Sequence, residues 1–276
     1  MVGAAGAGPA DPQLLTEHVE RVRGLAADYE APDFAEAPGP DAALFLCAID
    51  HSSGYQRPHA VDGDGPFDGS ALLWAVGCAA ERREPGLLSA ASLAAVEGDR
   101  VQELFEIEGE TVSGPEERAR LWRDLAAGLD RDYGGSAAGL LAGAESSLGG
   151  SGGLIARLAG FEAYADPLAK KSFLFAKIAA RRGWFEVADP ESWEVCADNV
   201  LMRIALRCGL VRPGPVEVVR ARTRAALKQL AIEAGLEPPL LDDLLWELGR
   251  RDPGLLGDAG GEAVREPARR KDVVWY

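Results

Sequence analysis

Apolar residues recur along most of the chain at intervals of three and four positions, the spacing of one face of an α-helix. The segment from residue 11 to residue 29 places Leu14, Val19, Val22 and Leu25 on one stripe. Alternation of apolar and polar residues, typical of strands, is nearly absent. The pattern therefore predicts an all-α fold, a helical bundle of about a dozen helices. Further long helices are expected at residues 70–84, 99–108, 113–135, 167–183, 196–211, 214–236 and 238–252.

The clearest helix boundaries are those around residues 113–135. Ser113 and Glu116 have the spacing of a capping box, and Pro115 suits the first turn of a helix. Gly134 is typical of the residue that ends a helix. No period of 20 to 50 residues repeats, so a solenoid is excluded. We expect residues 1–276 to form a single all-α domain, with two helical lobes at about 1–135 and 136–276 as the alternative.

The longest turn-rich segment, residues 51–69, reads HSSGYQRPHAVDGDGPFDG. A long loop inside a compact domain is often functional. Neither the HExxH spacing nor the twelve-residue calcium-loop pattern is present, so no metal ligand is predicted. Asp50, His51 and Tyr55 can offer hydrogen bonds and a stacking surface to a planar base. The acids and histidines gathered in and beside this loop are Asp50, His51, His59, Asp62, Asp64 and Asp68.

The charge of the chain narrows the range of partners. With 44 Asp and Glu against 29 Lys and Arg, the formal net charge is -15, whereas duplex binders normally present a basic face. The four cysteines are scattered and predict buried residues rather than zinc ligands or disulfides. No long uncharged apolar run or secretory signal is present. We therefore expect a cytoplasmic protein without cofactor, nucleic-acid partner, membrane association or obligate protein partner.

Two lysines, Lys170 and Lys171, begin an apolar helical run in the segment DPLAKKSFLF. Asp198 stands at the expected N-cap of a later helix, where backbone N–H groups and the helix dipole hold a carboxylate ionised. A carboxylate fixed in this way can stabilise an oxocarbenium-like sugar cation or orient a water against it. A lysine beside it could be a nucleophile, an ionic partner or a phosphate anchor. The plain alternative for Asp198 is an ordinary capping residue.

This order, a lysine opening one helix and an aspartate opening the next in a D-x-x-x-x-R pattern, resembles the helix-hairpin-helix DNA glycosylase superfamily. The wider chain is more similar to the queuosine salvage family, the queuosine 5'-phosphate N-glycosylases, which have a related all-α fold. The similarity extends over nearly the whole chain, from about residue 44 to residue 276. The similar segments are residues 45–50, 65–105, 115–136, 170–185, 197–211, 240–252 and the terminal VVWY.

The resemblance implies a nucleotide N-glycosylase that hydrolyses queuosine 5'-monophosphate to queuine and ribose 5-phosphate, which serves queuine salvage for tRNA modification. It implies Asp198 as the catalytic carboxylate and Lys171 as the catalytic lysine, with Lys170 one residue away. Asn199 replaces the aromatic residue that usually follows the aspartate, and IDHSSGY replaces a segment that reads roughly LNFxFW in eukaryotic members. The substrate-binding residues expected are Lys170, Asp50, His51, Tyr55, Asn199, Arg203, Trp275 and Tyr276.

Two other functions are compatible with the same residues. A DNA glycosylase that excises a damaged purine such as 8-oxoguanine would use Lys171 as a Schiff-base nucleophile, and would need a basic footprint on the duplex. A non-enzymatic module would use the pocket only to bind a nucleobase or a protein partner. The acidic composition favours a small nucleotide substrate over a duplex.

Overall fold

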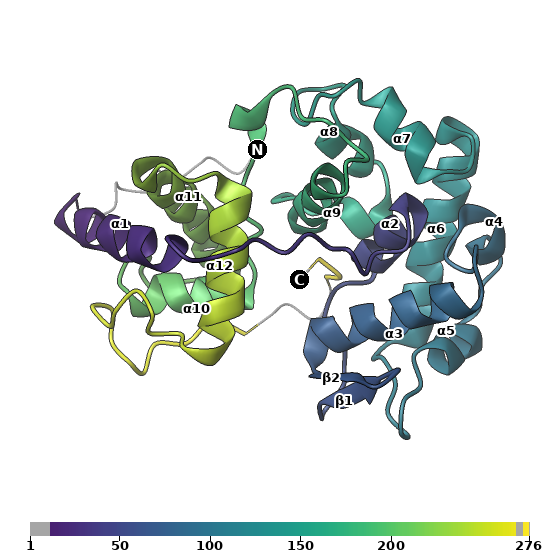
Figure 1. Ribbon diagram of the computed structural model, residues 1–276, viewed down its shortest axis with the longest axis horizontal. Coiled ribbons are helices and arrows are strands. Elements are labelled where there is room, and N and C mark those ends of the chain that lie inside the picture. The colour runs from purple at the N-terminus through teal and green to yellow at the C-terminus, as the bar shows by residue number, and fades with distance from the viewer. Residues whose placement is uncertain (1–11, 269–272, 276) are drawn as a thin grey trace. The chain divides into compact units, whose positions relative to one another are not determined.

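The computed structural model describes residues 12–268 and 273–275. Within them the chain forms twelve α-helices, two short 3-10 helices and one two-stranded antiparallel sheet (Figure 1). The prediction of an all-α fold is confirmed at the level of class. The four cysteines are buried, as the sequence predicts.

The described residues group into two compact units. One, here called the α1 unit, comprises residues 12–32 and 193–268, and the other, the α2 unit, comprises residues 33–192 and 273–275. The divisions of the chain therefore fall near residues 32 and 192. The lobe boundary considered from the sequence, near residue 135, lies inside the α2 unit.

The α1 unit contains four helices, which bury two apolar clusters between them. Helix α1 (Pro12–Ala26) contacts α11 (Val216–Ala234) and α12 (Pro238–Arg251), and α10 (Asn199–Arg207) contacts the same two helices. His18 of α1 lies 3.1 Å from the carbonyl oxygen of Cys208, to which its Nε2 atom can donate. The fully buried core side chains include Val22, Leu201, Ile204, Leu227, Leu230, Leu241, Leu244 and Leu245.

Helix α2 (Pro40–Ala48) is the centre of the other unit. Every residue from Ala42 to Ala48 is buried, as expected of a helix that is apolar on all sides. Neighbouring helices contact it: α3 (Gly69–Arg83), α6 (Pro115–Tyr133), α7 (Ala137–Gly143) and α9 (Lys170–Arg181). The shorter elements are α4 (Ala90–Leu93), α5 (Gly98–Leu104), α8 (Leu154–Leu158), η1 (Glu162–Tyr164) and η2 (Pro190–Ser192). No helix in the described part of the chain combines the length and apolar character needed to cross a membrane.

The turn-rich segment, which the sequence predicts to be a loop, contains a β-hairpin. Strands β1 (His59–Val61) and β2 (Asp64–Phe67) pair antiparallel. The connecting residues Asp62 and Gly63 have φ angles of 53° and 92°. Two consecutive positive φ angles are what a tight type I′ hairpin turn requires, and Asp-Gly is a favoured pair for it. The strands are only three and four residues long, too short to establish an alternating pattern in the sequence.

The predicted capping box of α6 is wrong. The N-cap is Gly114, in the left-handed conformation at φ 59°, and no side chain caps the helix. Ser113 Oγ instead donates to the carbonyl of Ser52 at 2.5 Å, and Glu116 accepts from the amide of Gly98 at 3.0 Å. Long-range contacts therefore displace the local capping pattern. The C-terminal prediction is confirmed, because Gly134 ends the helix at φ 61°.

Replacing Gly139 by alanine tests the close packing between the end of α6 and the start of α7. An alanine Cβ at position 139 would lie 2.1 Å from the carbonyl oxygen of Tyr133, and backbone cannot move aside as a flexible side chain can. We expect Gly139→Ala to lower the free energy of unfolding by about 2 kcal/mol, a typical overpacking cost. Urea denaturation measures it. Gly152→Ala, where a Cβ meets nothing within 4 Å, is the control, and an equal loss in both variants would contradict the packing argument.

Candidate functional site

The two lysines occupy the first two positions of α9, and the residues before them fix the start of this helix. The carboxylate of Asp166 accepts hydrogen bonds from the amides of Leu168 and Lys170, both at 2.9 Å. Ala169, the N-cap, has φ 51° and ψ 35°, a left-handed conformation that costs a residue with a Cβ roughly 1 kcal/mol or more. A strained residue directly before two lysines shows that the surrounding contacts hold this helix start in place.

Lys170 forms an ion pair with Asp50, 120 residues earlier in the chain. Its Nζ atom donates to Asp50 Oδ2 at 2.9 Å and to the Asp50 carbonyl at 3.2 Å, and Ser70 Oγ donates to Asp50 Oδ1 at 2.5 Å. The side chains of Lys170 and Asp50 are only 12% and 8% exposed. Burial by itself raises the pKa of Asp50, but the charge of Lys170 and the hydrogen bonds from Ser70 and Lys170 outweigh it and lower that pKa. Asp50 is therefore ionised at neutral pH.

Lys171 is fully buried and contacts a different set of groups. Its Nζ atom donates to the carbonyl of Ala48 at 2.6 Å and lies 3.0 Å from Nδ1 of His51. Burial, together with the positive charge of Lys170, lowers the pKa of Lys171 well below its usual value. His51 Nε2 lies 3.3 Å from Glu117 Oε1. Since a carboxylate only accepts, Nε2 carries the hydrogen and Nδ1 accepts from the amine.

Arg118 fixes the backbone of the loop that follows α2. It is fully buried, and it donates to the carbonyl oxygens of Ile49, His51, Ser52 and Ser113. Burial lowers the pKa of Arg118 to about 10, which leaves it charged at neutral pH. One guanidinium thus fixes the backbone on both sides of Asp50 and anchors it to the start of α6.

We call Asp50, His51, Ser70, Glu117, Lys170 and Lys171 the lysine cluster. The sequence singled out four of these residues, and the structure brings those four together. The sequence pattern did not identify Ser70, Glu117 or the supporting Arg118. The signal available for Arg118 was its spacing: it lies three and four residues before Leu121 and Trp122, which places it on the buried face of α6.

The remaining residues of the turn-rich segment point elsewhere. Tyr55 is half-buried and donates its hydroxyl to the carbonyl of Phe105 at 2.8 Å, and burial raises its pKa. His59 Nδ1 lies 3.0 Å from Glu108, and Asp62 pairs with Arg82 and Arg83. Across residues 12–268 and 273–275, no three His, Cys, Asp or Glu side chains are arranged to hold a metal ion.

Asp198 is the N-cap of α10, as predicted. Its Oδ1 accepts from the amide of Leu201 at 3.0 Å, and its side chain is half-buried. Asn199 is half-buried at the first position of α10, and Arg203 donates to the carbonyl of Gly249 at 3.2 Å. Trp275 is half-buried, whereas the predicted Tyr276 lies outside the described residues. Asp198 belongs to the α1 unit and Lys171 to the α2 unit, so their partnership stays a prediction.

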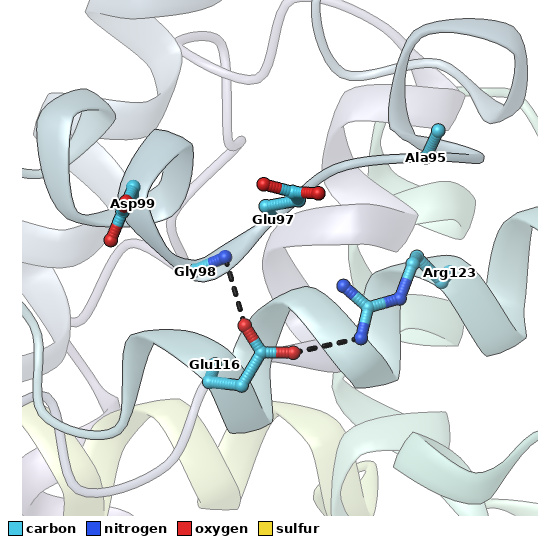
Figure 2. A pocket seen from close by; sticks show the side chains of 6 residues that line it. All are labelled: Ala95, Glu97, Gly98, Asp99, Glu116 and Arg123. Atoms are coloured by element: carbon cyan, nitrogen blue, oxygen red, sulfur yellow. Dashed lines mark hydrogen bonds and ion pairs between the residues drawn. The ribbon is translucent and has the colours of Figure 1, made fainter.

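A pocket of about 400 Å³ lies elsewhere on the α2 unit, beside the start of α5 (Figure 2). Glu116 lines it and accepts from the amide of Gly98 at 3.0 Å and from Arg123 at 2.8 Å. Glu97 and Asp99 add further negative charge around it. The single arginine is already paired, so this pocket would repel a nucleotide phosphate, and no described residue of the predicted site lines it.

Replacing Lys170 by methionine tests the ion pair through its pH dependence. In the wild type the Asp50 contribution to stability is present above the unfolded pKa near 3.8 and is lost as the pH falls through the lowered folded pKa. Without Lys170, burial raises the pKa of Asp50, so stability falls as the pH rises. We expect Lys170→Met to cost about 1–2 kcal/mol more at pH 7 than at pH 4.

Urea denaturation at both pH values measures this difference. The double variant Lys170→Met with Asp50→Asn is the control, because it removes the titrating carboxylate and should lose the added pH dependence. A cost of Lys170→Met that is the same at pH 4 and pH 7 would show that Asp50 does not depend on this cation.

Comparison with known proteins found no family model and no curated protein that matches the chain.

Proposed function

We propose that this protein hydrolyses the N-glycosidic bond of a modified nucleoside 5'-monophosphate, with queuosine 5'-monophosphate as the substrate and queuine and ribose 5-phosphate as the products. The observation that carries the proposal is the Asp198 carboxylate, half-buried and held at the N-terminus of α10 by the amide of Leu201. It occupies the position that the family resemblance gives to the catalytic carboxylate. The helix dipole and the capping hydrogen bond both favour its ionised form.

In the proposed reaction, Asp198 stabilises the positive charge that develops at ribose C1′ as the bond to the base breaks. A water oxygen bonds to C1′, and the departing base takes up a proton, so the products are the free base and ribose 5-phosphate. A preorganised charge of this kind contributes most when it cannot rotate away from the reacting centre. The capping bond provides that restraint.

The different burial of the two lysines supports different roles. Lys170, whose side chain is 12% exposed, is suited to contact an anionic substrate at the edge of the lysine cluster. Lys171 has no exposed surface and is suited to support the loop of Asp50 and His51 from inside. We therefore assign the substrate-facing role to Lys170, one residue before the position that the resemblance favoured.

The same burial weakens the DNA glycosylase alternative. A Schiff-base nucleophile must reach C1′ of the sugar, and the Lys171 amine is enclosed by the Ala48 carbonyl and the His51 ring. We also propose that the fold is related to that of the helix-hairpin-helix glycosylases, because α9 with its lysines precedes α10 with its capping aspartate along the chain. Sodium borohydride trapping on duplex DNA containing 8-oxoguanine tests the alternative, which requires a covalent adduct lost in Lys171→Met.

The direct test is to incubate the purified chain with queuosine 5'-monophosphate and to measure free queuine by liquid chromatography and mass spectrometry. We expect queuine and ribose 5-phosphate in equal amounts. Queuosine without the phosphate and guanosine 5'-monophosphate are the matched controls, for the phosphate and for the base. Turnover of guanosine 5'-monophosphate alone would retain the chemistry and reject the substrate. Tight binding of the nucleotide with no bond cleavage would favour a non-enzymatic binding module.

A further inference from the structure

Charged side chains of α11 and α12 hold the segment that leads to Asp198. Glu194 accepts from Arg224 Nε at 3.0 Å and from Lys228 Nζ at 2.9 Å. These three side chains are about one fifth to one quarter exposed. The segment is therefore tied to α11 four residues before Asp198.

Two further contacts lie closer to Asp198 and are more deeply buried. Arg220 of α11 is fully buried, and its Nε donates to the carbonyl of Ala197 at 3.0 Å. Asp242 of α12 is 4% exposed, and its Oδ1 accepts from the amide of Cys196 at 2.9 Å. The two residues directly before Asp198 are thus each held by a buried charged side chain from a different helix.

Burying an arginine and an aspartate in this way is costly. Both side chains lose their hydration, and a pair of apolar residues often gives equal or greater stability in such places. Apolar side chains, however, cannot fix a carbonyl and an amide of an irregular segment at chosen positions. The arrangement is therefore suited to specifying the geometry of residues 196–198 and not simply to filling the core.

We propose that Arg220 and Asp242 are positioning residues that fix the Asp198 carboxylate for catalysis. The inference rests on the proposed function, because it assigns these residues a role through Asp198. They act on the backbone directly before Asp198, Arg220 through the carbonyl of Ala197 and Asp242 through the amide of Cys196. A displacement of a catalytic group by about 1 Å can cost on the order of 100-fold in rate.

The first measurement is the kinetics of queuine release in Asp242→Ala and Arg220→Met. We expect kcat to fall by about 10- to 100-fold while KM stays within about threefold, since the substrate contacts remain. Asp242→Asn should recover most of kcat, because the amide oxygen accepts the same bond from Cys196. Asp258→Asn, an exposed carboxylate of the same unit that pairs with Arg207, is the control. A proportional rise in KM with unchanged kcat would overturn the proposal.

The second measurement needs no substrate, so it separates failure of this inference from failure of the proposed function. Hydrogen exchange of the Leu201 amide reports directly on its bond to Asp198. We expect its protection to fall by about tenfold or more in Asp242→Ala and Arg220→Met, beyond the change in global stability. If Arg220→Met does not fold, Arg220→Lys replaces it, because an ammonium cannot reproduce the Nε donor. Unchanged Leu201 protection in folded variants would overturn the proposal, whether or not the wild type is active.

Discussion

Replacing Asp198 by asparagine is expected to lower the rate of queuine release by about 1,000-fold or more, the order of magnitude associated with losing one preorganised stabilising group at a reacting centre. Asparagine is nearly as good an N-cap as aspartate, and its amide oxygen can still accept from the amide of Leu201. The substitution therefore removes the charge and keeps the helix start. The measurement is kcat for queuosine 5'-monophosphate, together with thermal unfolding of the variant.

The structure offers a matched control for this substitution. Asp258→Asn removes the same charge from the α1 unit at a side chain that is 42% exposed, and should leave kcat within about twofold, as expected of a change remote from the reacting atoms. An active Asp198→Asn variant would show that Asp198 only caps α10. If Asp198→Asn lowers activity and stability together, the loss of activity follows from unfolding and gives the charge of Asp198 no catalytic role of its own.

Replacing Arg118 by methionine is expected to lower the free energy of unfolding by about 3–5 kcal/mol, among the largest effects of a single substitution. Methionine fills much of the same volume but donates no hydrogen bond. The carbonyl oxygens of Ile49 and His51, both bonded to Arg118 inside the protein, would then be left without this donor. Each hydrogen bond lost to a charged donor inside the protein costs about 1.5–3 kcal/mol. Urea denaturation followed by circular dichroism measures the change.

Arg120→Ala is the control for Arg118, because it is on the same helix and its side chain is 46% exposed in an ion pair with Glu162. We expect a change within about 0.5 kcal/mol, as for most surface substitutions. Arg118→Lys should recover little of the lost stability, since one ammonium cannot donate to carbonyls arranged around a planar guanidinium. A stable Arg118→Met variant would mean that the loop after α2 keeps its conformation by other contacts.

The contribution of Arg118 to the free energy of unfolding is linked to the geometry of the lysine cluster through the backbone. Arg118 fixes the carbonyls on both sides of Asp50, and Asp50 in turn fixes the Nζ atom of Lys170. A loss at Arg118 should therefore displace Lys170 as well as destabilise the α2 unit. This is the reason to measure queuine release of any folded Arg118 variant beside its stability.

Local features of the chain were the ones that could be predicted. The stripe through Val19 and Val22 predicts α1, and Gly134 predicts the end of α6, because helical hydrogen bonds and helix caps join residues only a few positions apart. The capping role of Asp198 was predicted for the same reason. The β-hairpin was missed because its strands are too short to establish an alternating pattern, although Asp62 and Gly63 carry the turn signal.

The pattern of residues was enough to predict the all-α class, most helix positions, the apolar character of α2 and the cap at Asp198. The folded chain was needed to show that Lys170 meets Asp50 across 120 residues, that Lys171 is enclosed with His51, and that Arg118 is turned inward. These contacts arise where α9 and α6 pack against α2. Periodicity states which face of a helix is buried, but not which other helix covers it, because side-chain packing between distant segments leaves no local pattern in the chain.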